Sequence, residues 1–179
     1  MIYKFRIVSD EVDSFRLEVM IDSDETFLRL RNVILESVGY SKDEIDSFFI
    51  CDDEWARGQE ITLMEMDTDS TEDFYIMEDT ALSEFVEDEG QKLLFTYDYI
   101  NDRSFFMEMT EMIPGKSLSE PYCSRKEGNA PVQIHDINKS FEVHPVMATT
   151  SDDLDEEFYG QEGFEAEELE SLESYEEEL

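Results

Sequence analysis

Two runs near the N-terminus alternate apolar and polar residues with a period of two. The apolar positions are Tyr3, Phe5 and Ile7 in the first run, then Phe15, Leu17, Val19 and Ile21 in the second. Successive side chains of a β-strand point to opposite faces, so this period indicates two strands that each bury one face. The short connection over residues 9–14 lets them pair as an antiparallel hairpin. The fold must therefore build its core on an antiparallel sheet.

A helix is expected directly after this hairpin. The apolar residues that recur there at helical spacing are Phe27, Leu30, Ile34 and Val38. Ser23 or Asp24 is a suitable N-terminal cap, and Gly39 is a suitable residue to end the helix. Shorter helical segments are expected over residues 41–46 and 80–86.

Further strands are expected along the rest of the chain. The predicted ranges are 48–51, 61–66, 93–100 and 105–113, with an edge strand at 141–144 and a long loop over 114–138. Asn101-Asp102 supplies turn residues between two of these strands, which predicts a second hairpin. The predicted class is α+β, with antiparallel β-hairpins forming a mixed sheet packed against a few helices.

The charge restricts domain organisation and partners. The chain has 48 acidic and 13 basic residues, a net charge of −35, while 40% of its residues are hydrophobic and supply a core. Residues 151–179 carry 14 acids and no Lys or Arg. We therefore predict a folded domain over 1–150 and an acidic, disordered tail over 151–179. Direct binding to nucleic acid or to an anionic membrane is excluded, because both require a basic surface.

The N-terminus and the cysteines indicate a cytoplasmic protein. The first residues alternate charged with apolar side chains and form no secretory signal, and no stretch has the length of a membrane span. Cys51 and Cys123 are far apart and are expected to be reduced thiols. His135 and His144 do not follow a zinc-ligand spacing with them.

One acidic segment follows the spacing of a calcium-binding loop. Asp67, Asp69, Thr71 and Asp73 place oxygen atoms at alternate positions, and Glu78 occupies the twelfth position. A glutamate at the sixth position, where the loop needs glycine, argues against a true EF-hand. We expect at most weak binding of Ca²⁺ or another divalent cation, and no other cofactor.

A second acidic segment, Asp52-Asp53-Glu54 beside Trp55, is interpreted as a solvated loop. Adjacent carboxylates do not by themselves provide the two different environments that acid–base catalysis requires. No catalytic residues are therefore predicted.

Several short motifs occur in an order that resembles a known family. They are Tyr3–Ile7, Thr26–Leu30, Gly39-Tyr40, Phe95–Tyr99, Pro121–Cys123 and Gly128–Pro131. Together they resemble the plasmid pRiA4b ORF-3-like proteins over roughly residues 1–135. The resemblance implies that family's fold and a link to mobile elements. The family's second hairpin carries Gly, Asp, Trp and His where this chain has Ile100, Asn101, Arg103 and Phe105, so any chemistry of that cluster is not expected here.

Three functional hypotheses follow. The first is a non-catalytic protein–protein interaction module, in which the acidic body and tail attract a basic protein surface and aromatic residues of the tail anchor it. The second is a nucleic-acid mimic that regulates a DNA- or RNA-binding protein. The third is a metal-dependent enzyme acting in the family's cleft. The sequence favours a protein without enzymatic activity.

Overall fold

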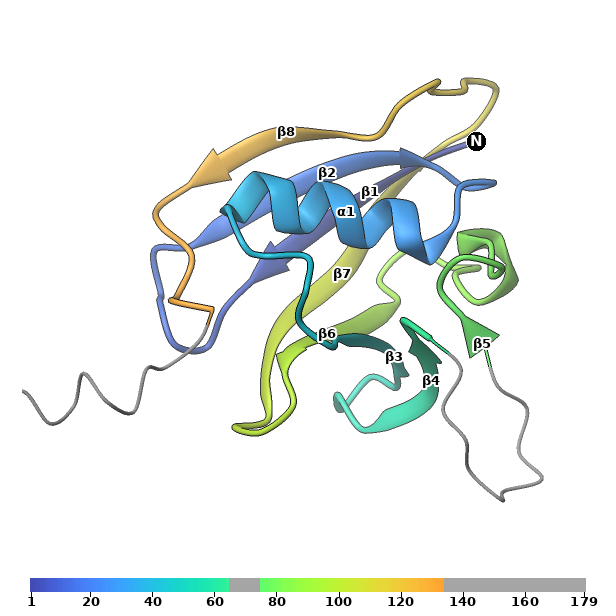
Figure 1. Cartoon of the computed structure of the whole chain (residues 1–179). Helices are drawn as coiled ribbons and strands as arrows, with labels where there is room; N and C mark the ends of the chain where they lie inside the picture. Colours follow the sequence, from blue (N-terminus) through green and yellow to red (C-terminus); the bar gives the residue numbers. More distant parts are fainter. Residues whose placement is uncertain (65–74, 134–179) are drawn as a thin grey trace, which may run out of the picture. The chain divides into compact units, whose positions relative to one another are not determined.

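The computed structural model describes residues 1–64 and 75–133. Their strands form one eight-stranded sheet in the order β5-β4-β3-β6-β7-β1-β2-β8 (Figure 1). The strands are β1 (Ile2–Val8), β2 (Arg16–Asp22), β3 (Ser47–Cys51), β4 (Arg57–Thr62), β5 (Tyr75–Ile76), β6 (Lys92–Asp98), β7 (Arg103–Ile113) and β8 (Tyr122–Glu127). All neighbours are antiparallel except the short β4–β5 pair, which makes the sheet mixed.

Both predicted hairpins are confirmed. β1 pairs with β2 in a register that places Phe5 opposite Val19, and β6 pairs with β7 so that Phe95 lies opposite Phe105. β1 also pairs with β7, which joins the two hairpins at the middle of the sheet. The period-two pattern thus places the alternate apolar residues of adjacent strands on one face.

The predicted long helix is confirmed as α1 (Phe27–Val38), which lies across one face of the sheet (Figure 1). Phe27, Leu30 and Ile34 are fully buried in the core between them. The cap differs from the prediction. The Thr26 side chain accepts the hydrogen bond from the Arg29 backbone N–H, while Ser23 and Asp24 lie in the turn after β2.

The predicted number of helices was too high. The described chain is mainly β, with α1 as its single α-helix. Residues 41–46 form no helix, because the Arg31 guanidinium binds the Asp46 carboxylate at 2.6 Å and donates to two carbonyls of this loop. The segment expected as a helix over 80–86 holds only the 3-10 turn η1 (Leu82–Glu84).

Two strand predictions also need correction. The strand predicted over 61–66 begins earlier, as β4, and the predicted loop over 114–138 contains β8, which pairs with β2. The edge strand predicted at 141–144, the boundary at residue 150 and the tail lie outside the described residues. None of the helices in the described ranges is long and apolar enough to cross a membrane.

Candidate functional site

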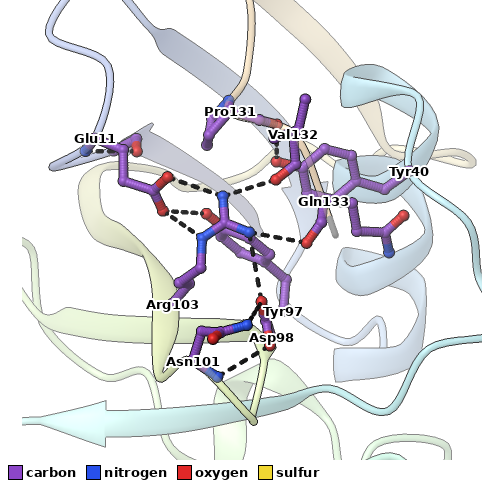
Figure 2. A network of polar contacts seen from close by, with 10 residues as sticks. Glu11, Tyr40, Tyr97, Asp98, Asn101, Arg103, Pro131, Val132 and Gln133 are labelled. Atoms are coloured by element: carbon purple, nitrogen blue, oxygen red, sulfur yellow. Dashed lines mark hydrogen bonds and ion pairs between the residues drawn. The ribbon is translucent and has the colours of Figure 1, made fainter. Parts of the chain in front are cut away.

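A polar network surrounds Arg103 at the start of β7 (Figure 2). Its Nε and Nη2 atoms donate to the two carboxylate oxygens of Glu11, each at 2.8 Å. Nη1 donates to Asp98 at 3.4 Å and to the carbonyl of Gln133 at 3.0 Å, and Nη2 donates to the carbonyl of Val132 at 2.7 Å. These bonds account for all five N–H donors of the guanidinium.

Two tyrosines complete this network, Tyr97, which is buried, and Tyr40, which is partly buried. The Tyr97 hydroxyl donates to Glu11 at 2.9 Å, and its ring lies 5.1 Å from the Arg103 guanidinium carbon. The Tyr40 hydroxyl donates to the carbonyl of Pro131 at 2.5 Å. Burial is the main cause that raises the pKa of both tyrosines, so both remain protonated donors at neutral pH.

We call this group of contacts the Arg103 network, and it fixes one segment of the chain to the rest of the fold. Its members are Glu11, Tyr40, Tyr97, Asp98, Arg103 and residues 131–133. It holds segment 131–133 against the β6–β7 hairpin, and two hydrogen bonds between Gln133 and Ser41 hold the same segment against the loop after α1. Arg103 stands where the family motif has tryptophan, and Phe105, where it has histidine, is buried in the core. The network therefore stabilises the fold and presents no free nucleophile or base.

The residues of the predicted calcium loop are only partly described. Asp67, Asp69, Thr71 and Asp73 lie outside the described residues, and Glu78 is exposed in the turn after β5. Within residues 1–64 and 75–133 there is no group of three or more His, Cys, Asp or Glu side chains that would hold a metal ion. The calcium site stays a prediction.

The two cysteines are free thiols. Cys51 ends β3 and is buried, which raises the pKa of its thiol. Cys123 lies on β8 and is partly exposed. Both histidines lie outside the described residues.

Acidic side chains outnumber basic ones in the described part of the chain. Residues 1–64 and 75–133 include 27 acidic and 12 basic side chains. Nine of the twelve basic side chains form ion pairs. Sixteen carboxylates in this part of the chain have no cation within 4 Å among the described residues. The cations are thus largely neutralised, and the remaining surface charge is negative.

The sheet face opposite α1 carries two rows of side chains that run across the strands. The strand registers place Val8 opposite Phe106, Phe106 opposite Leu94, and Leu94 opposite Phe49. We call these four side chains the apolar row. The row beside it alternates in charge, and its members are Arg125, Glu18, Arg6, Glu108 and Lys92. No helix of the described chain lies on this face, since α1 and η1 both contribute to the core on the other side.

Trp55 lies beside the apolar row, in the turn between β3 and β4. Its backbone has φ 67°, a left-handed conformation that is rare for a bulky residue. The indole meets Phe106 edge-on, with the ring centroids 5.0 Å apart. The Lys92 ammonium lies 5.1 Å from the indole centroid and donates to the carbonyl of Asp53 at 2.5 Å. The sequence indicated the acidic loop, but the position of the indole depends on the turn conformation and on strand register.

Comparisons with known proteins give one family match and one structural likeness. The family model for plasmid pRiA4b ORF-3-like proteins matches residues 3–170. No curated protein matches the chain. A crystal structure of a protein of unknown function from Methanosarcina mazei Go1 is similar, with a TM-score of 0.54 and 14% identity over 70% of this chain and 68% of that one. At this identity the likeness shows the fold alone.

Proposed function

The chain belongs to the plasmid pRiA4b ORF-3-like protein family, and we propose that it is a non-catalytic protein-interaction module whose negative surface binds a basic surface on another protein. The module would act in the cytoplasm, where Cys51 and Cys123 remain free thiols. Residues 151–179 would add their 14 acids to the attraction.

The observation that carries this proposal is the imbalance in ion pairing. Nine of the twelve basic side chains in the described ranges form ion pairs with the protein's own acids, while sixteen carboxylates have no cationic partner within these ranges. Exposed charges of one sign create a potential that accelerates encounter with a partner of the opposite sign. A basic protein surface supplies the missing cations.

The family motif is altered in the β6–β7 hairpin, and the Arg103 network formed there supports a non-catalytic role. Every N–H of Arg103 is used within the fold, and both Tyr97 and Tyr40 donate to fixed acceptors. General acid–base catalysis needs a group that reaches the substrate with a free donor or acceptor. These side chains instead secure the scaffold that carries the acidic loops.

Binding of labelled peptides to the full chain tests the proposal. Fluorescence anisotropy would compare a lysine-rich peptide with a matched peptide in which glutamine replaces every lysine. We expect the lysine peptide to bind at least about tenfold more tightly, a difference of about 1.4 kcal/mol. Equal affinity for the two peptides, or no binding of either, would contradict the proposal.

A further inference from the structure

We infer that the sheet face around Trp55 is the docking surface of this module, and that its occupant is a partner segment in which basic residues alternate with apolar ones. The inference rests on the proposed function and adds to it the location of the site and the kind of segment bound. It combines an aromatic surface, nearby carboxylates that have no cation within 4 Å among the described residues, and an internal cation that already occupies part of the site.

The apolar row supplies the hydrophobic part of the surface. Within the row, Val8 is 36% exposed and Phe49 and Phe106 are partly exposed, while Leu94 is buried. Trp55, beside the row, is also partly exposed. The row crosses four adjacent strands, which corresponds to about 14 Å at the usual strand spacing. This length accommodates two or three apolar side chains from one face of a partner segment. Aromatic side chains provide large contact areas of the kind that dominate binding energy at protein interfaces.

The loops next to Trp55 supply the charge complementarity. Asp52 and Asp53 in one loop and Asp88 and Glu89 in the other line an open hollow of about 400 Å³. None of these four carboxylates has a cation within 4 Å in the described part of the chain. A segment that lays its apolar side chains on the row would bring its basic side chains to this hollow.

Lys92 shows how a cation is held at this site. Its ammonium lies over the Trp55 indole and donates to the Asp53 carbonyl, so it uses both a cation–π contact and a hydrogen bond. A lysine or arginine of the partner has the same chemistry and would compete for these groups.

The backbone at Trp55 gives a further reason to assign function here. Glycine would adopt φ 67° without the steric cost that a bulky side chain has in this conformation. Residues held in such conformations are concentrated at functional sites. In this turn the unfavourable conformation places the indole against Phe106 and under Lys92.

Trp55 is the single tryptophan of the chain, so its emission reports directly on the site. The probe is a labelled peptide that alternates lysine with leucine, titrated with the full chain. We expect peptide anisotropy and Trp55 emission to change with the same midpoint. If anisotropy saturates while the emission stays constant, binding occurs elsewhere and the docking site is wrong, although the proposed function survives. If anisotropy does not change, both are wrong.

Replacing Trp55, with a control substitution away from the indole, provides a second test. Trp55→Gly removes the indole in a turn conformation that glycine readily adopts, and we expect it to weaken peptide binding about 5- to 30-fold. Ile45→Ala removes a side chain that is 54% exposed in the loop before β3 and should leave binding unchanged. Circular dichroism melts would establish that both variants are folded. Equal binding by the two folded variants would overturn the inference.

Charge substitutions distinguish binding at a local site from attraction by the net charge of the whole chain. The double variant Asp53→Asn, Asp88→Asn and the control Asp10→Asn, Asp13→Asn change the net charge by the same amount. The first pair lines the hollow and the second lies in the exposed β1–β2 connection. We expect the first pair to weaken peptide binding several-fold more than the second. Equal effects would mean that only the overall charge matters.

Because Lys92 competes with the partner's cations for the indole, replacing it should strengthen peptide binding, whereas the other substitutions at the site should weaken it. Lys92→Gln frees the indole face, so it should strengthen peptide binding more than Lys42→Gln, which changes the net charge equally in an exposed pair with Glu36. If Lys92→Gln weakens binding in a folded protein, the internal ammonium is part of the scaffold and does not occupy the partner's site.

Discussion

Replacing Arg103 with alanine tests whether the Arg103 network holds the fold together. The Arg103 side chain is only 8% exposed and forms ion pairs with Glu11 and Asp98. Alanine leaves both carboxylates without this cation. It also removes the donors that the carbonyls of Val132 and Gln133 accept from.

The expected loss follows from this geometry. Removing one partner of a buried ion pair destabilises a protein by about 3–5 kcal/mol. The Glu11 side chain is 31% exposed, so water recovers part of that cost, and we expect Arg103→Ala to lower the free energy of unfolding by about 2–4 kcal/mol. The assay is urea denaturation of the full chain, followed by circular dichroism.

The matched control is Lys42→Ala. Lys42 also forms an ion pair, but its side chain is 45% exposed and that of its partner Glu36 is 65% exposed. Such pairs contribute at most about 1 kcal/mol. If Arg103→Ala lowers the free energy of unfolding no more than Lys42→Ala does, the Arg103 network does not hold the fold together.

Three further predictions concern stability. Because the described surface is negative, raising NaCl from very low to about 0.1 M should raise the melting temperature by screening self-repulsion; a flat or falling temperature in calorimetry would contradict this. Burial opposes ionisation of Glu18 and Asp22, but hydrogen bonds from Lys4 and Arg16 to Glu18, and from backbone N–H groups to Asp22, outweigh it and lower both pKa values. Their contribution is therefore present above about pH 4 and lost as pH falls below it, so urea midpoints should drop between about pH 5 and pH 3, and constant midpoints would count against it. Deleting residues 151–179 should leave the thermal unfolding of the body nearly unchanged, and a large loss on deletion would mean that the segment packs as part of the domain.

The regular elements were predictable because their patterns are local. Period two in β1 and β2, helical spacing with Gly39 in α1, and turn residues between β6 and β7 each identify an element from neighbouring residues alone. The helices predicted over 41–46 and 80–86 were wrong because tertiary contacts outweighed weak local preferences. Arg31 binds Asp46 across the first segment, and only one 3-10 turn forms in the second.

The candidate site was less predictable because it depends on contacts between distant residues. β8 lies among Pro, Gly and Ser residues and is a strand only because it pairs with β2. The apolar row requires the registers of four strands, and the contact between Trp55 and Lys92 joins the β3–β4 turn to the start of β6. The sequence indicated the acidic loop next to Trp55 but contained no local signal that the indole lies on the sheet.

The salt dependence of peptide binding tests the central claim, that this protein binds basic partners through its negative surface. The dissociation constant of the lysine–leucine peptide for the full chain would be measured by anisotropy at NaCl concentrations from about 0.05 to about 0.3 M, over which the screening length falls substantially. We predict that the constant rises about tenfold or more over this range. A dissociation constant that stays the same across the range would contradict the claim.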